Sequence, residues 1–127
     1  MKPGLILFAH GARDPRWATP FEEIARRVRA QRPDLEVRLA YLELMAPDLP
    51  TAGDELAAAG CTQVSVVPMF LGTGGHVRRD LPQLLDRIRD AHPQLKVTAG
   101  PPIGEIDSVM HAMVAAAAAA CDEGGGR

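Results

Sequence analysis

Four short apolar segments alternate along the chain with four segments of helical periodicity. The apolar segments span residues 5–9, 37–42, 64–70 and 96–99, and the first is an unbroken apolar run. Such a run is typical of a strand that is buried on both faces of a parallel sheet. Strands that alternate with helices predict right-handed βαβ units, with helices on both faces of about four parallel strands.

Capping residues, glycine and proline predict where the helices begin and end. Thr19 to Glu22 resembles a capping box at the start of the first helix, with proline at its first position. Asp48 and Asp80 are suited to cap the second and third helices. The predicted stops are Pro33, Gly60 and Pro93. An apolar stripe at helical spacing, from Ile106 to Ala117, predicts a last helix.

Length and composition indicate one globular domain. The chain has 127 residues, enough to bury a real core. We expect residues 1–121 to form this domain and residues 122–127 to form a flexible tail. The two cysteines form no CxxC motif, which disfavours a disulfide or a zinc finger.

Net charge and hydropathy argue against two classes of partner, nucleic acids and membranes. The formal net charge of −2 argues against a broad nucleic-acid surface. No apolar run approaches the roughly 20 residues of a membrane span, and the first apolar run is too short for a signal peptide. The expected location is therefore the cytoplasm, without nucleic-acid or membrane partners.

Two histidines and a glutamate follow predicted strands. His10 follows the first, Glu43 the second and His76 the third. Because open α/β sheets bind ligands outside the carboxyl ends of their strands, these side chains should converge on one edge. Two imidazoles and a carboxylate are a common ligand set for a divalent transition metal, and the same groups can act as bases.

Structural roles compete with this interpretation. A single histidine at a strand end is usually a hydrogen-bonding residue, but two at such ends, each beside glycine, favour a site. Glu43 is equally well explained as a solvated carboxylate. His92 and His111 are expected to be a helix-end residue and a helix-face residue.

Other residues near the histidines suit a flat, acidic ligand. Arg13 and Arg78 flank the two histidine loops, and arginine forks suit carboxylates. The glycine-rich loop before His76, which includes Gly74 and Gly75, lets backbone approach a ligand but lacks the spacing of a nucleotide-binding loop. Apolar contact with a flat ligand is open to Trp17, Met69 and Phe70, although the last two also fit a strand core.

Three motifs in this order resemble the short CbiX/SirB sirohydrochlorin chelatases. HGARDP at residues 10–15 resembles that family's HGSRDP-type signature, with alanine in place of the frequent serine. YLE at residues 41–43 resembles its F-L-E element, and HVRRDLP at residues 76–82 resembles its H-x-x-x-D-[IL]-P signature. The likeness covers essentially the whole chain.

The resemblance implies a lyase-type metal chelatase with a single flavodoxin-like domain that pairs as a homodimer. Its substrates would be sirohydrochlorin, a polycarboxylated tetrapyrrole, and a divalent metal: Co²⁺ for cobalamin or Fe²⁺ for sirohaem, with nickel used by related members. No permanently bound cofactor is expected. His10, His76 and Glu43 carry over as metal ligands and proton acceptors.

Two other functions remain open at this stage. A metal carrier or sensor would use the same histidines without a tetrapyrrole. A histidine phosphatase also begins with a strand that ends in His-Gly, but it needs an arginine directly before the histidine, where this chain has Ala9.

Overall fold

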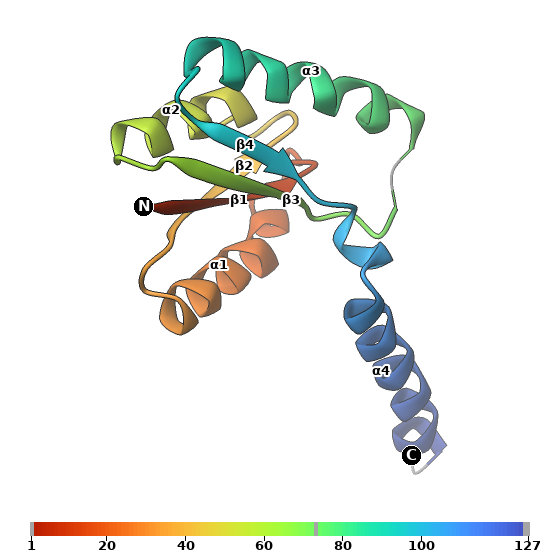
Figure 1. Cartoon of the computed structure of the whole chain (residues 1–127). Helices are drawn as coiled ribbons and strands as arrows, with labels where there is room; N and C mark the ends of the chain where they lie inside the picture. Colours follow the sequence, from red (N-terminus) through yellow and green to blue (C-terminus); the bar gives the residue numbers. More distant parts are fainter. Residues whose placement is uncertain (1, 73, 126–127) are drawn as a thin grey trace.

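A parallel sheet of four strands forms the centre of the molecule. The computed structural model describes residues 2–72 and 74–125, without the side chains of residues 76 and 123–125. The strands lie in the order β2-β1-β3-β4 (Figure 1). Their bounds are Pro3–Ala9 for β1, Glu36–Tyr41 for β2, Gln63–Pro68 for β3 and Lys96–Ala99 for β4.

Helices cover both faces of this sheet, which confirms the predicted α/β class. On one face lies α1 (Thr19–Gln31); α2 (Leu49–Ala58) and α3 (Gly75–Ala91) lie together on the other (Figure 1). Two short 3-10 helices, η1 (Pro15–Ala18) and η2 (Ile103–Glu105), precede α1 and the last helix, α4 (Asp107–Gly125).

The core is divided between the two faces because successive strand side chains point in opposite directions. Ile6 and Phe8 of β1 are fully buried in the larger cluster, which receives Leu56 from α2 and Ile88 from α3. Leu7, between them, belongs to a smaller cluster beneath α1. The central strand is therefore apolar on both sides, which explains its unbroken apolar run. Burial of each such side chain contributes about 1.5–3 kcal/mol.

The start of α1 differs from the prediction. Thr19 does not cap the helix, and no side-chain cap is present at Ala18. Instead, the Asp14 carboxylate accepts a hydrogen bond of 2.9 Å from the backbone N–H of Arg16. This bond starts η1, which leads directly into α1. The helical path thus begins at Pro15, where proline has no N–H to leave unsatisfied.

The start of α3 also differs, because the helix begins at Gly75 rather than after Asp80. The N–H of Arg78 donates to the carbonyl of Gly74 at 3.1 Å, and Pro82 lies inside the helix. Val77 is 7% exposed, four residues before Leu81, so the apolar face of α3 extends one turn further back.

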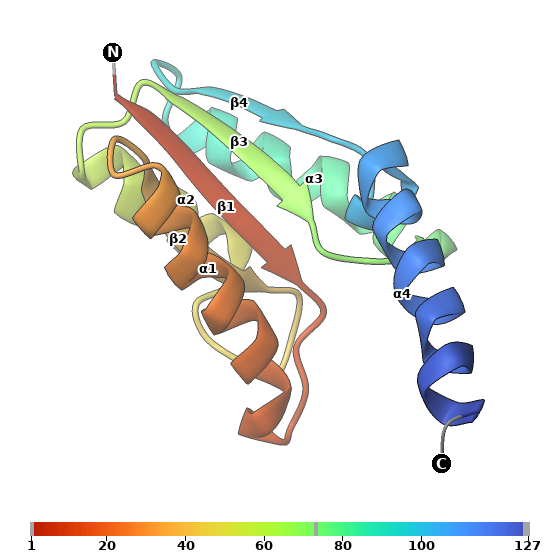
Figure 2. The same ribbon diagram turned by 90° about the horizontal axis from the view of Figure 1, so that it is seen from below.

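The last helix leaves the body of the protein. In Figure 1 α4 stands clear of the sheet and of the other helices, and in Figure 2 its C-terminal end extends beyond them. Its helical structure continues through Gly125, into the segment expected to be a tail; residues 126 and 127 lie outside the described residues. No helix in the described ranges is both long and apolar enough to cross a membrane.

Candidate functional site

The carboxyl ends of β1 and β2 bring His10 and Glu43 side by side. The parallel pairing continues past both strands, since the N–H of Leu42 donates to the carbonyl of Ala9 at 2.9 Å. The N–H of Glu43 then donates to the carbonyl of His10 at 3.1 Å. Two residues that are far apart in sequence are thus fixed as backbone neighbours at the edge where ligands bind to such sheets.

Their side chains also meet. Nε2 of His10 lies 3.1 Å from Oε1 of Glu43, within hydrogen-bond distance. The side chains are 54% and 55% exposed, so both face solvent. An imidazole nitrogen and a carboxylate in this position can share a proton, or can turn lone pairs toward a cation.

Gly11 makes this approach possible. Its φ of +91° lies in the left-handed region, which residues other than glycine rarely adopt. A Cβ atom at this position would lie 1.9 Å from the carbonyl oxygen of Glu43. The His-Gly pair is therefore a structural unit, because glycine lets the backbone after β1 pass directly over the loop after β2.

Phe70 supports the imidazole from the other side. Its ring packs edge-on against His10, with ring centroids 6.4 Å apart and an interplanar angle of 84°. It also packs edge-on against Phe8 of the core, at 6.0 Å. Phe70 therefore joins the hydrophobic core, as one interpretation of the sequence expected, and also contacts the candidate site.

The third predicted ligand lies on a different element from that expected. His76 is in the first turn of α3, and its side chain lies outside the described part of the structure. Among the described side chains, no group of three histidine, cysteine, aspartate or glutamate residues could hold a metal ion. The structure therefore places two of the three predicted ligands together.

The predicted substrate contacts lie at the surface. Arg13 and Arg78 are exposed. A Cβ atom at Gly74 or Gly75 would meet nothing within 4 Å, so the backbone at the start of α3 is open to an approaching ligand.

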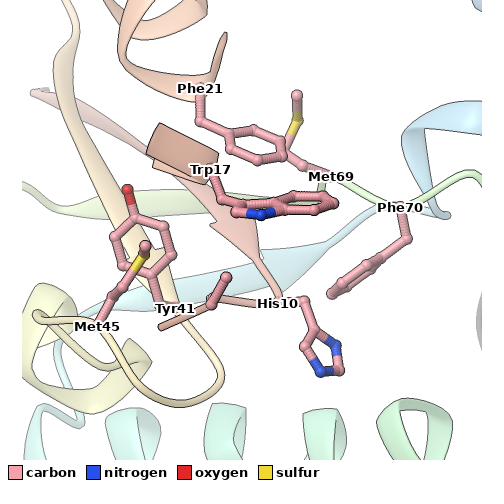
Figure 3. A pocket seen from close by; sticks show the side chains of 9 residues that line it. His10, Trp17, Phe21, Tyr41, Met45, Met69 and Phe70 are labelled. Atoms are coloured by element: carbon pink, nitrogen blue, oxygen red, sulfur yellow. The ribbon is translucent and has the colours of Figure 1, made fainter. Parts of the chain in front are cut away.

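A cavity of about 350 Å³ opens beside His10 (Figure 3). The sequence had suggested apolar contacts from Trp17, Met69 and Phe70, and all three line it. The full lining is His10, Gly11, Ala12, Trp17, Phe21, Tyr41, Met45, Met69 and Phe70. Phe21, Tyr41 and Met45 could not be predicted as cavity residues, because they come from separate parts of the sequence that meet only in the folded chain.

The cavity wall at Tyr41 is shielded from solvent. The side chain is 5% exposed, and burial, with a smaller effect of the Glu22 carboxylate, raises the pKa of the phenol. The phenol is therefore neutral at physiological pH, and the cavity wall that it forms carries no charge.

Comparisons with known proteins agree with the fold and with the motifs. The family model CbiX matches residues 4–120. A crystal structure of a CbiX protein from Marinobacter aquaeolei superposes with a TM-score of 0.82 and 30% identity, covering 95% of this chain and 98% of that one.

Two curated relatives carry names that specify a reaction. The sirohydrochlorin cobaltochelatase of Methanococcoides burtonii is 28% identical, with 81% of this chain and 85% of the relative covered. The sirohydrochlorin ferrochelatase of Bacillus subtilis is 27% identical over 89% of this chain, but the match spans only 43% of that longer protein.

Proposed function

The chain belongs to the CbiX family, and on this premise we propose that it is a sirohydrochlorin chelatase, which inserts a divalent metal ion into the tetrapyrrole. The observation that carries the proposal is the His10–Glu43 pair, 3.1 Å apart at the carboxyl edge of the sheet. An imidazole and a carboxylate in contact combine the two capacities that insertion needs, namely metal ligation and proton uptake.

Proton balance defines the task of this pair. A divalent metal that enters the macrocycle replaces two pyrrole N–H protons, so two protons must leave for each metal inserted. The imidazole of His10 and the carboxylate of Glu43 can each accept one. Because both side chains are about half exposed, the protons can pass on to water, which resets the pair for the next cycle.

The metal is a substrate, so the site must hold it only moderately. His10, Glu43 and His76 are the proposed ligands, and a position open to solvent lets the ion be transferred. Co²⁺ and Fe²⁺ are the proposed metals, because the relatives are named for both. Imidazole and carboxylate ligands bind several first-row ions, Ni²⁺ included, so supply can decide which one is used.

The peripheral carboxylates of the tetrapyrrole need cationic partners. Arg13 and Arg78 are proposed for this role, because both are exposed and guanidinium groups pair with carboxylates in a two-pronged geometry. Gly74 and Gly75 would admit an edge of the ligand, since the space around their backbone is open.

We further propose that two copies of the chain pair through α4. Met110 and Val114 are 47% and 62% exposed, on a helix that stands away from the body (Figure 1). A second copy presents an identical apolar face, and pairing two such faces would remove both from water.

Metal insertion measured by absorbance tests the assignment directly. With Co²⁺ and sirohydrochlorin, His10→Ala and Glu43→Gln are each expected to lower kcat at least ~100-fold, the usual range for loss of a proton-transfer group. His92→Ala is the matched control, because this histidine also contacts a carboxylate, with Nε2 2.6 Å from Asp54 Oδ1, but lies at the opposite end of α3 from the site. Its kcat should equal that of the wild type.

Three outcomes would contradict the proposal. Wild-type rates in both site variants would remove the pair from the reaction. A wild-type protein that binds Co²⁺ without inserting it would instead be a metal carrier. An equal loss in the His92 variant would point to a general effect on folding. Parallel assays with Co²⁺, Fe²⁺ and Ni²⁺ identify the preferred metal.

A further inference from the structure

The apolar cavity lies beside the metal-binding pair rather than around it. The imidazole of His10 stands at the rim and points away from Trp17 and Phe21 (Figure 3). Apart from His10 and the neutral phenol of Tyr41, no residue that lines the cavity carries an ionisable group. Beyond His10, the lining therefore suits an uncharged, apolar surface.

Trp17 is the unusual member of this lining. Its side chain is 67% exposed, and it belongs to neither cluster of the hydrophobic core. The fold therefore does not use the indole for packing. A large aromatic side chain that is left in solvent at the mouth of an apolar cavity is typical of a ligand contact.

The backbone holds Trp17 in this place. The N–H of Trp17 donates to the carbonyl of Asp14 at 3.1 Å. The Asp14 carboxylate also accepts bonds from the Arg16 guanidinium, the shortest at 2.7 Å, and this pairing lowers the pKa of Asp14. The turn is thus fixed by the Asp14–Arg16 pair and by the backbone, and the indole side chain of Trp17 does not contribute to it.

We infer that the indole of Trp17 packs against the flat face of the tetrapyrrole and is a substrate-binding residue. This inference rests on the proposed function. A conjugated macrocycle is apolar on its faces and carries its carboxylates at its periphery. Burying carboxylates in an uncharged cavity would be costly, so the ring face enters and the carboxylates stay outside, where Arg13 and Arg16 are exposed.

The size of the cavity agrees with this arrangement. At about 350 Å³ it lies at the lower end of the range for small-molecule sites. It is therefore too small to enclose the macrocycle. Part of one ring face covers it, the carboxylate-bearing periphery stays in solvent, and the centre of the ring is free to face the His10–Glu43 pair. Trp17 then contributes binding, whereas His10 and Glu43 act on the reacting nitrogens.

This division predicts a kinetic signature. A contact made equally in the bound substrate and in the transition state changes KM and leaves kcat unchanged. Loss of one aromatic stacking partner typically weakens binding ~10-fold or more. Trp17→Ala should therefore raise both the Kd for metal-free sirohydrochlorin and its KM by ~10-fold, with kcat within ~2-fold of wild type. Trp17→Phe should retain most of the binding.

The experiment measures Kd from the visible absorption of sirohydrochlorin without metal, and KM and kcat for Co²⁺ insertion, in the full chain and both variants. Urea unfolding midpoints equal to that of the wild type would verify that the variants fold. A wild-type Kd and KM in Trp17→Ala would overturn the inference, as would a fall in kcat with an unchanged Kd.

The two proposals fail separately. If the wild type binds sirohydrochlorin but inserts no metal, the proposed function is wrong, while the ratio of the Kd values for Trp17→Ala and wild type still decides the role of Trp17. If the wild type inserts metal and Trp17→Ala binds normally, only the inference about Trp17 is wrong. If the wild type binds no sirohydrochlorin, both are wrong.

Discussion

Gly11 sets the geometry of the His10–Glu43 pair through its missing side chain. Gly11→Ala would place a Cβ atom 1.9 Å from the carbonyl oxygen of Glu43 at a φ of +91°, so the backbone after β1 must move. We expect a loss of about 3 kcal/mol in the free energy of unfolding. Metal insertion should also fall strongly, because His10 moves away from Glu43. Urea unfolding and the insertion assay measure the two effects.

Gly60 provides the matched control. Its φ is +89°, but a Cβ atom there would meet nothing within 4 Å. Gly60→Ala therefore carries the cost of the left-handed backbone alone, about 1–2 kcal/mol, and insertion should be unchanged. If the two alanine variants lost the same stability and kept the same activity, the close contact with Glu43 would have no role in the site.

At the scale of residues, the alternation of strands and helices was enough to predict that His10 and Glu43 would lie at one edge of a parallel sheet. Parallel strands place the residues that follow them together, and the structure brings the two side chains into contact. The contributions of Phe21 and Tyr41 to the cavity could not be predicted in this way. Both are ordinary apolar positions of their own elements, and only the tertiary arrangement turns them toward His10.

At the scale of elements, all four strands were predicted, and the errors concern where two helices begin. Thr19 and Asp80 have side chains suited to helix caps. In both cases, however, helical structure already begins at an earlier residue. Asp14 already starts a helical turn before Thr19. The buried side chain of Val77 stabilises an extra turn before Asp80. The Asp14 cap decided the first boundary, and packing, which a local pattern does not contain, decided the second.

The cap of α2 was predicted correctly and has a pH dependence that can be measured. The Asp48 carboxylate accepts a hydrogen bond of 2.9 Å from the N–H of Thr51, and hydrogen bonding to Thr51 lowers the pKa of Asp48. Because the folded pKa lies below the unfolded value, the stabilisation is complete above about pH 4. It is lost as the pH falls through the lowered pKa.

Two variants separate the cap from its charge. Asp48→Ala should lower the free energy of unfolding by about 1 kcal/mol at pH 7. Asp48→Asn keeps a capping oxygen that does not titrate, so its stability relative to wild type should improve between pH 7 and pH 3. Urea midpoints at both pH values measure this change. A difference between wild type and Asp48→Asn that is independent of pH would show that the carboxylate charge contributes nothing.

At the scale of the whole molecule, α4 is tied to the candidate site although it stands away from the sheet. The N–H of Gly104 in η2 donates to the carbonyl of Phe70 at 2.9 Å, and Phe70 packs on His10. A Cβ atom at Gly104 would lie 2.4 Å from the carbonyl oxygen of Leu71. The root of α4 is thus seated on the loop that follows β3. The apolar stripe predicted the helix, but not whether it packs within its own chain.

Charge substitution on α4 tests the proposed pairing of two copies. Val114→Glu puts a carboxylate on the apolar face, where Val114 is 62% exposed, and burying this charge against a partner would be costly. Ala112→Glu adds the same charge to an exposed residue that helical spacing turns toward the opposite face. Light scattering should give the mass of two chains for wild type and Ala112→Glu, and of one chain for Val114→Glu. Because dissociation leaves the anchor at Gly104 intact, the single chain should remain folded. A one-chain mass for the wild type at micromolar concentration, or a two-chain mass for Val114→Glu, would exclude this face as the contact.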